Sequence, residues 1–184
     1  MNEEILDIVD ENDQIIGQEP RTAVHSQGLK HREVHVWFFN NKGQVLFQIR
    51  SKNVETSAGL LDATVGGHVD LGNTYLQSAV KEAKEEAGLD IKEENLIFLG
   101  VIYLERVDEN GLINNAFKGT YAYEFNDSLD RLIPEKGKSD GFKWVYIKEL
   151  FNLSDNDKHF AINAKDKEYV EKIFGGIQKI MNEE

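Results

Sequence analysis

Short runs of apolar residues separated by polar turns predict that much of the chain is β-strand. The runs are rich in Val, Ile, Phe and Tyr, and Asn, Asp, Gly or Ser lies between them, as expected for strands joined by turns. Residues 33–39 and 44–49 should form a hairpin, because the Asn-Asn-Lys-Gly sequence between them is a turn signal. The predicted strands cover residues 5–9, 14–17, 33–39, 44–49, 96–107, 118–125 and 141–147, and residues 60–69 should be extended.

Residues 74–87 instead have the three- and four-residue apolar spacing of an amphipathic helix. Thr74 is a suitable N-cap for this helix, and Gly88 is a suitable residue to end it. The apolar stripe contains Leu76, Val80, Ala83 and Ala87. This is the clearest helix in the sequence.

A second helical stripe covers residues 165–181, where the pair Gly175-Gly176 weakens the helix but need not break it. Residues 22–29 are expected to be a short helix or a loop. Strands mixed with helices in this order predict an α/β or α+β layered domain. A length of 184 residues suits one domain with a sizeable core. The consecutive aromatic residues Trp37, Phe38 and Phe39 are expected in that core, with Phe38 on the opposite side of its strand from the other two.

Composition narrows the function. No apolar run is long enough to cross a bilayer, and the acidic residues 1–10 lack the basic and apolar segments of a signal peptide. The chain has no cysteine, which excludes disulfides, thiolate metal sites and thiol nucleophiles. The net charge of −12 argues against nucleic-acid binding, but it permits a small anionic substrate whose charge a metal ion neutralises. A cytoplasmic enzyme is the simplest fit.

Three carboxylates on the predicted helix form the main chemical feature. Glu82, Glu85 and Glu86 stand at i, i+3 and i+4, so they share a face, which we expect roughly opposite the apolar stripe. Like charges at this spacing repel one another, and a divalent cation such as Mg²⁺ or Mn²⁺ would turn the repulsion into binding. The alternative is a solvated acidic face that Lys81 and Lys84 partly neutralise.

The segment before the helix favours the metal interpretation. Gly66 and Gly67 end an extended stretch, and a polar loop at 70–73 leads into the helix. A strand, a loop and a helix in this order bring backbone groups close to a phosphate-sized ligand.

The same segment resembles the Nudix box, G-x5-E-x7-R-E-U-x-E-E-x-G-U, where U is aliphatic. Gly67 matches the first glycine, and the spacing is kept to the end of the motif. The later matches are Glu82, Ala83, Glu85, Glu86, Gly88 and Leu89. Two positions depart from the motif: Asn73 stands at the first glutamate and Lys81 at the arginine. Lysine supplies the charge of arginine but not its bidentate fork, so these departures bear on catalytic efficiency rather than on the fold.

This resemblance implies a Nudix-type α/β/α sandwich with a mixed sheet, in which residues 1–32 extend the fold and 165–181 form the C-terminal helix. It implies Mg²⁺-dependent hydrolysis of a diphosphate linkage in a small molecule, such as a nucleoside diphosphate linked to another moiety. The metal ligands would be Glu82, Glu85, Glu86 and the Gly67 carbonyl. Lys81 would steady the carboxylates, and either Glu85 or Glu86 would serve as the base. A homodimer is compatible with this assignment, and the substrate-binding residues cannot be named.

Residues outside the box resemble the Nudix branch that contains isopentenyl-diphosphate isomerase and its hydrolase-like relatives. Matching stretches include Ile8-Val9-Asp10 and residues 28–32 and 45–50. In the isomerase a cysteine precedes the motif histidine, and a pair of glutamates lies on a later strand. Here glycines stand at the cysteine position, and residues 110–117 contain no Glu or Asp, which disfavours isomerase activity.

Three histidines, His25, His31 and His68, correspond to those that bind the isomerase's metal, so a second metal site is one interpretation. The other is that His25 and His31 are ordinary polar or capping residues, since two carboxylate ligands of the isomerase are missing. A catalytically weak binding or regulatory module is a further alternative for the whole chain, and Asn73 favours it. Glu105, Glu135 and Asp140 are additional candidates for a base or metal ligand, among which the sequence does not choose.

Overall fold

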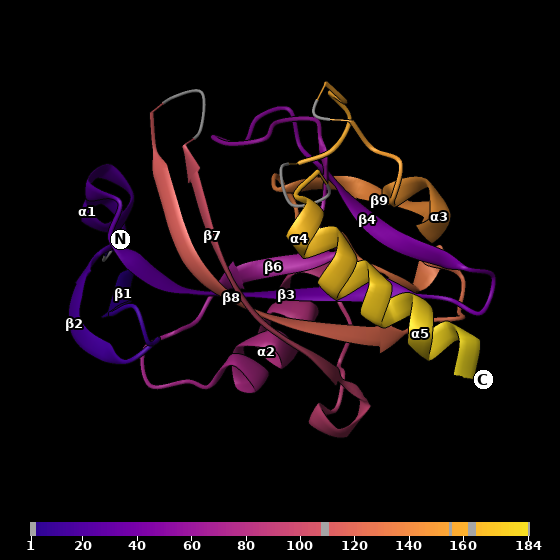
Figure 1. Cartoon of the computed structure of the whole chain (residues 1–184), viewed down its shortest axis with the longest axis horizontal. Coiled ribbons are helices and arrows are strands. Elements are labelled where there is room, and N and C mark those ends of the chain that lie inside the picture. The colour runs from indigo at the N-terminus through magenta and orange to yellow at the C-terminus, as the bar shows by residue number, and fades with distance from the viewer. Residues whose placement is uncertain (1–2, 108–110, 155, 162–164, 184) are drawn as a thin grey trace.

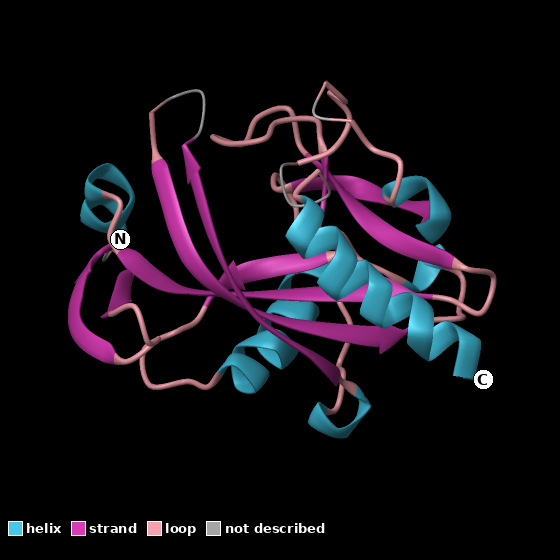
Figure 2. Cartoon of the chain, viewed as in Figure 1, coloured by secondary structure: helices cyan, strands magenta, loops and turns pink. Residues whose placement is uncertain are grey.

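The computed structural model describes residues 3–107, 111–154, 156–161 and 165–183, and these form one nine-stranded mixed sheet with helices on both faces. Figure 2 shows the sheet between the helices. The strands are β1 (Ile5–Val9), β2 (Ile15–Pro20), β3 (Lys30–Phe39), β4 (Gln44–Arg50), β5 (Leu61–Asp62), β6 (Val65–His68), β7 (Ile97–Val107), β8 (Ile113–Glu124) and β9 (Ser139–Tyr146).

The helices lie at the start of the chain, in its middle and at its end. They are α1 (Arg21–Gln27), α2 (Tyr75–Ala87), α3 (Ile147–Leu150), α4 (Lys167–Tyr169) and α5 (Gly175–Glu183), with a π-helical turn at Val170–Phe174 and 3-10 turns at Glu93–Asn95 and Leu129–Arg131. Helices α4 and α5 and the turn between them form one helical segment that crosses the front of the sheet in Figure 1, while α2 lies behind it. Gly175 and Gly176 therefore do not break the predicted C-terminal helix. None of the described helices is long and apolar enough to cross a membrane.

Strand β3 is the centre of the sheet. It pairs in parallel with β8 along its whole length, from Lys30 opposite Asn115 to Phe39 opposite Glu124. Its other edge pairs antiparallel with β6 over residues 33–36. The predicted hairpin with β4 is therefore reduced to a single pair, Phe39 opposite Val45, because β6 already occupies this edge, and β4 pairs with β9 instead.

Two apolar cores lie on the two faces of the sheet. Trp37 and Phe39 pack with Phe174 and Ile177 of the C-terminal segment. Phe38 points to the other face and packs with Ala83 and the rest of the α2 core. The predicted alternation of these aromatic residues is thus confirmed, and so is the core position of all three.

Several predicted boundaries were wrong. Strand β8 begins at Ile113 rather than at residue 118, because its polar first half, with Asn114 and Asn115, pairs with β3 and β7 on either side. Residue 147, predicted as strand, begins α3. Residues 22–29 form mainly the helix α1. Residue 110, part of the acid-free stretch 110–117, and residues 1 and 2 of the acidic N-terminus lie outside the described residues.

Candidate functional site

The ends of α2 are fixed as the sequence predicts. Thr74 Oγ1 accepts a hydrogen bond from the Gln77 backbone N–H at 3.2 Å, and the Gln77 side chain accepts one from the Thr74 N–H at 2.9 Å. This reciprocal capping box satisfies two backbone donors of the first turn. Gly88 ends the helix with a left-handed φ of 69°. The rotation of α2 beneath β6 is therefore well defined.

The Glu82 carboxylate lies directly against Gly67 of β6. A Cβ placed on Gly67 would be 2.5 Å from Glu82 Cδ and 2.7 Å from each carboxylate oxygen. Only glycine permits this approach, because real side chains do not tolerate such a contact. The resemblance implies that the Gly67 carbonyl is a metal ligand, and the structure places the Gly67 backbone beside the first glutamate of the set.

Glu86 is held by two donors from the sheet. Its Oε2 accepts hydrogen bonds from the Gly66 backbone N–H at 2.9 Å and from Gln48 Nε2 at 3.2 Å. Gln48 is buried on β4 and also donates to the Thr64 carbonyl at 3.4 Å. Sequence reasoning missed Gln48, because a lone glutamine on a strand carries no local signal.

Glu82 and Glu86 are only 8% and 7% exposed, so they face the sheet beside Ala83 and Ala87. The prediction that all three carboxylates lie opposite the apolar residues was wrong for these two. The pKa of each is raised to about 7, mainly by burial and, for Glu86, also by the charge on Glu82. The nearby ammonium of Lys138 partly opposes this rise for both.

Two buried carboxylates with raised pKa values are unfavourable in their ionised form when no cation is bound. They are suitable ligands for a divalent cation. Hard oxygen ligands close together are what Mg²⁺ prefers. A cation between them would stabilise the ionised forms that burial disfavours. The donor set therefore fits the metal that the sequence predicts.

Glu85 lies on the outer side of this pair, with its side chain 51% exposed. Lys81 Nζ connects the group, at 3.6 Å from Glu85, 4.0 Å from Glu82 and 2.8 Å from Asp70. The hydrogen bond to Asp70 raises the pKa of Lys81. Asp70 thus supplies the anionic partner that Asn73 cannot, and the Asn73 amide itself donates to Asp70 at 3.4 Å. Sequence reasoning did not assign this role to Asp70.

The additional carboxylate candidates lie in different places. Glu135 is connected to the site through Lys138, whose Nζ is 2.9 Å from its carboxylate and whose charge acts on Glu82 and Glu86. Glu105 is on β7, opposite Asn115 of β8, and Asp140 is exposed on β9. Among the three candidates, Glu135 is therefore the one with a contact to a residue that acts on the helix carboxylates.

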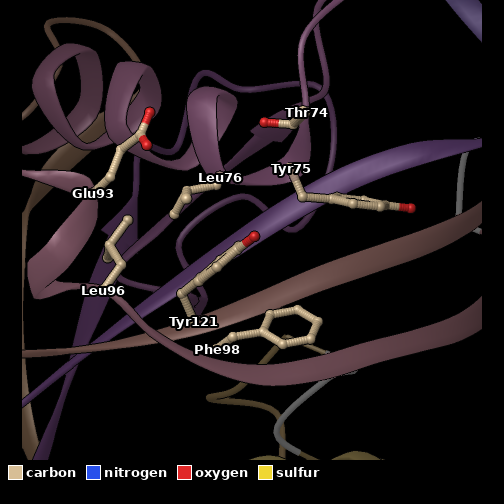
Figure 3. A pocket seen from close by; sticks show the side chains of 7 residues that line it. All are labelled: Thr74, Tyr75, Leu76, Glu93, Leu96, Phe98 and Tyr121. Atoms are coloured by element: carbon tan, nitrogen blue, oxygen red, sulfur yellow. The ribbon is translucent and has the colours of Figure 1, made fainter.

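An open apolar pocket lies at the start of α2, apart from the carboxylates. Its lining includes Leu76, Leu96, Phe98 and Tyr121, and these side chains surround it in Figure 3. Neither Glu82 nor Glu86 lines it. This pocket is consequently no part of the candidate metal site.

The three predicted histidines come together from three elements. His25 of α1, His31 of β3 and His68 of β6 each offer a ring nitrogen, and these atoms lie within 4.8 Å of one another. The ring centroids are 5.0 to 5.4 Å apart. The cluster is at the opposite end of β6 from Val65, beyond the glycine pair.

The hydrogen bonds of the cluster fix which ring nitrogens are free to bind an ion. Each Nδ1 faces an oxygen: the Ile113 carbonyl for His25, the Leu29 carbonyl for His31 and Glu4 for His68, at 3.1 to 3.2 Å. Because an oxygen accepts, each Nδ1 is the N–H donor, and each Nε2 of a neutral ring is a bare lone pair. This is the orientation in which a metal-ligating histidine donates its other nitrogen to a carbonyl or carboxylate.

The Nε2 atoms of His25 and His68 are 3.2 Å apart. Two lone pairs do not attract at this distance, so the contact requires a proton or a metal ion. Burial lowers the pKa of His25 to about 4 and that of His31 to about 3, so these two rings are expected to be neutral. The buried Nε2 of His31 has no hydrogen-bond partner among the described residues. The three ring nitrogens are thus placed so that they could hold a metal ion.

Comparisons with known proteins identify the family of the chain. Residues 29–167 match the NUDIX domain family. An uncharacterized Nudix hydrolase of Clostridium acetobutylicum is 29% identical over all of this chain and 90% of its own length. Isopentenyl-diphosphate Delta-isomerase of Serratia proteamaculans is 30% identical over 87% of each chain. Nudix hydrolase 3 of Arabidopsis thaliana is 31% identical over 92% of this chain, which spans 23% of that longer protein.

Solved structures share the fold. A protein from Deinococcus radiodurans superposes with a TM-score of 0.71 at 24% identity, covering 91% of this chain and 98% of its own. The NUDIX domain of Shewanella oneidensis NrtR, solved in complex with ADP ribose, gives a TM-score of 0.56 at 12% identity over 84% of this chain and 92% of its own. These likenesses confirm the predicted α/β/α fold with a mixed sheet.

Proposed function

The chain belongs to the NUDIX domain family and is a Nudix hydrolase, and we propose that it uses Mg²⁺ to hydrolyse a diphosphate linkage in a small molecule. The observation that carries this proposal is the pair of buried carboxylates, Glu82 and Glu86, held against the backbone of Gly66 and Gly67. Mn²⁺ is a reasonable substitute for Mg²⁺, because both prefer oxygen ligands.

Glu82, Glu86, Glu85 and the Gly67 carbonyl would hold the cation. When bound, the metal neutralises charge on phosphate oxygens and lowers the pKa of an attacking water. The chain's own contribution is to fix the carboxylates: Gly66 and Gln48 orient Glu86, and Gly67 admits Glu82.

Glu85 is our candidate for the base that accepts the proton of the attacking water. Glu86 Oε2 already accepts two hydrogen bonds in a buried position, whereas the Glu85 carboxylate is half exposed and, within the part of the chain that the structure describes, has a longer contact with Lys81. A base must reach the water whose proton it takes. Lys81 is a positioning residue that connects Glu85, Glu82 and Asp70.

The proposed substrate is a nucleoside diphosphate linked to another moiety. The ADP ribose complex of the structural neighbour is consistent with this class. The net charge of −12 makes a long polyanion an unsuitable partner, whereas a small diphosphate needs only local neutralisation by the metal. The cytoplasmic location and the homodimer stay predictions.

The His25, His31 and His68 cluster is proposed as a second metal site. Its three convergent Nε2 lone pairs support this assignment. The relative from Serratia is an isomerase, but this chain has no cysteine, and the described part of β8 nearest the cluster offers Asn114, Asn115 and Ala116 rather than a carboxylate. We therefore place hydrolysis ahead of isomerisation.

The test is product release from a panel of nucleoside diphosphate derivatives, ADP ribose included, with Mg²⁺ present. Glu86→Gln should slow hydrolysis by at least about a hundredfold, the scale of a lost electrostatic stabiliser. Glu94→Gln, at an exposed position on the 3-10 turn after α2, is the matched control and should keep full activity.

Three other outcomes would decide against parts of this proposal. Wild-type activity in a variant with glutamine at positions 82, 85 and 86 would remove α2 from the mechanism. Negligible release from every compound would favour a binding module. Interconversion of isopentenyl and dimethylallyl diphosphates, followed by NMR, would make the chain an isomerase. This reaction releases no phosphate, so it cannot be confused with hydrolysis.

A further inference from the structure

A buried ion pair stands beside the histidine cluster, and the register of the sheet explains why. Glu33 of β3 is opposite His68 of β6 on one side and opposite Lys118 of β8 on the other. His31 is two residues before Glu33, so the two side chains share a face of β3. A histidine, a carboxylate and a lysine therefore lie in a row across three neighbouring strands.

The two oxygens of Glu33 have different partners. Lys118 Nζ donates a hydrogen bond to Oε2. The Oε1 atom accepts from Asn114 Nδ2 at 2.9 Å and lies 3.5 Å from His31 Nε2 and 3.9 Å from His68 Nε2. His31 Nε2 has no hydrogen-bond partner among the described residues, and His68 Nε2 is beyond hydrogen-bond distance of Glu33, so neither donates to Oε1. One carboxylate oxygen therefore faces the cluster without a histidine donor to bind.

Two of the separations are close to the spacing of ligands around one ion. Four ligands at about 2.0–2.1 Å from a tetrahedral metal ion are roughly 3.3 Å from one another. The observed separations of 3.2 Å between His25 and His68 Nε2, and 3.5 Å between His31 Nε2 and Glu33 Oε1, are close to this value. Glu33 Oε1 is thus the carboxylate oxygen that faces His31 and His68, at 3.5 and 3.9 Å from their Nε2 atoms.

We propose that Glu33 is the fourth protein ligand of a transition-metal site with His25, His31 and His68, and that Lys118 is a built-in competitor for its carboxylate. The proposal rests on the histidine site proposed above, but not on hydrolysis at α2. Three imidazoles and one carboxylate suit Zn²⁺ or Co²⁺ better than Mg²⁺. Glu33 and Lys118 are both buried, so their charges compensate each other in the absence of a metal, and a bound cation must share Glu33 with the lysine ammonium.

The test measures Co²⁺ binding by its visible absorption, which requires no enzymatic activity. The starting protein carries Glu82→Gln and Glu86→Gln, so that the α2 site does not bind Co²⁺. Adding Lys118→Met, which replaces the ammonium by an apolar side chain of similar length, should tighten Co²⁺ binding by about tenfold or more. Adding Glu33→Gln to that variant should remove the gain and change the absorption spectrum, because one oxygen ligand is lost.

Glu33→Gln alone would leave the Lys118 ammonium buried without its partner, which is expected to destabilise the fold. The double change Glu33→Gln with Lys118→Met leaves no unpaired buried charge and avoids this problem. His35→Gln is the matched control, since His35 lies on the same face of β3 but contacts Tyr169 instead of the cluster; it should leave Co²⁺ affinity unchanged. A gain from Lys118→Met that persists after Glu33→Gln would overturn the ligand role of Glu33. Absence of Co²⁺ binding in every variant would overturn the whole site, while hydrolysis by the wild-type protein would be unaffected.

Discussion

The Glu82 carboxylate fills the space that a side chain at position 67 would need. A Cβ on Gly67 would be 2.5 Å from Glu82 Cδ, but the obstructing group is the end of a flexible side chain rather than backbone. The helix and the strand can therefore stay in place while the carboxylate moves. A substitution at Gly67 can therefore displace a proposed metal ligand without unfolding the protein.

Gly67→Ala should consequently abolish most Mg²⁺ binding without unfolding the protein. The added methyl group would push Glu82 away from β6, so hydrolysis should fall by at least about tenfold. The melting temperature without metal should hold or rise slightly, because Glu82 would leave a site whose burial disfavours its charge. Calorimetry for Mg²⁺ affinity, an activity assay and thermal melting would measure the three effects.

Gly66→Ala is the matched control for this prediction. It adds the same methyl group one residue earlier on β6, where the nearest atom is His35 Cδ2 at 3.1 Å rather than Glu82. Its Mg²⁺ affinity should stay within a few-fold of the wild type. Equal loss of Mg²⁺ affinity in both variants would mean that the strand, and not the Glu82 contact, controls binding.

The sequence predicted a cluster of carboxylates on α2 but not how its members are placed. Spacing alone identified Glu82, Glu85 and Glu86 as neighbours on α2. It placed Glu82 and Glu86 on the wrong face, because the apolar stripe is only part of the buried face, which also includes the small residues Ser78 and Ala79. The burial of Glu86 depends on donors from Gly66 and Gln48. These residues lie on other strands, so the sequence pattern of α2 does not reveal them.

The same limit applies to the residues that sequence reasoning missed. Glu33 and Lys118 are 85 residues apart, and only the parallel pairing of β3 with β8 brings them together. The histidines were found through resemblance, whereas their Nδ1 partners, among them Glu4, became visible only in the fold. Motifs indicate which residues along the chain carry chemistry. The order of the strands determines which buried charges lie close enough to compensate each other.

The contact between Lys81 and Asp70 leads to a second prediction. Both side chains are partly exposed, so the ion pair contributes little to stability, about 1 kcal/mol at most. Its role is to hold Lys81 between Glu82 and Glu85. Asp70→Asn should lower kcat by about two- to fivefold with little change in KM or melting temperature.

Lys81→Met should lower kcat to a similar extent, and the double variant should be no worse than Lys81→Met alone, because the two residues act through one contact. Lys84→Met is the control: this lysine is on the same helix but pairs with Asp90, so it should keep wild-type kcat. Additive losses from Asp70→Asn and Lys81→Met would show that Asp70 acts by another route.

The pH dependence of Mg²⁺ binding follows from the raised pKa values of Glu82 and Glu86. Their pKa is about 7 in the folded protein against 4.5 for an ordinary glutamate. A carboxyl group with a higher pKa in the folded state destabilises the fold as it ionises, so without metal both groups lower stability as the pH rises from 4.5 through about 7. Mg²⁺ binds the ionised form and therefore competes with protons.

The rise in melting temperature that Mg²⁺ produces should accordingly be small near pH 5.5 and largest above about pH 8, with apparent affinity increasing by up to about tenfold per pH unit where one proton is displaced. Scanning calorimetry at several pH values, with and without Mg²⁺, measures this directly.

The variant with Glu82→Gln and Glu86→Gln should show no such rise at any pH. Compared with the wild type without metal, it should also gain stability progressively between pH 4.5 and about 7, because the unfavourable ionisation is gone. A stabilisation by Mg²⁺ that is the same at pH 5.5 and pH 8 would mean that the ion binds elsewhere than at these two carboxylates.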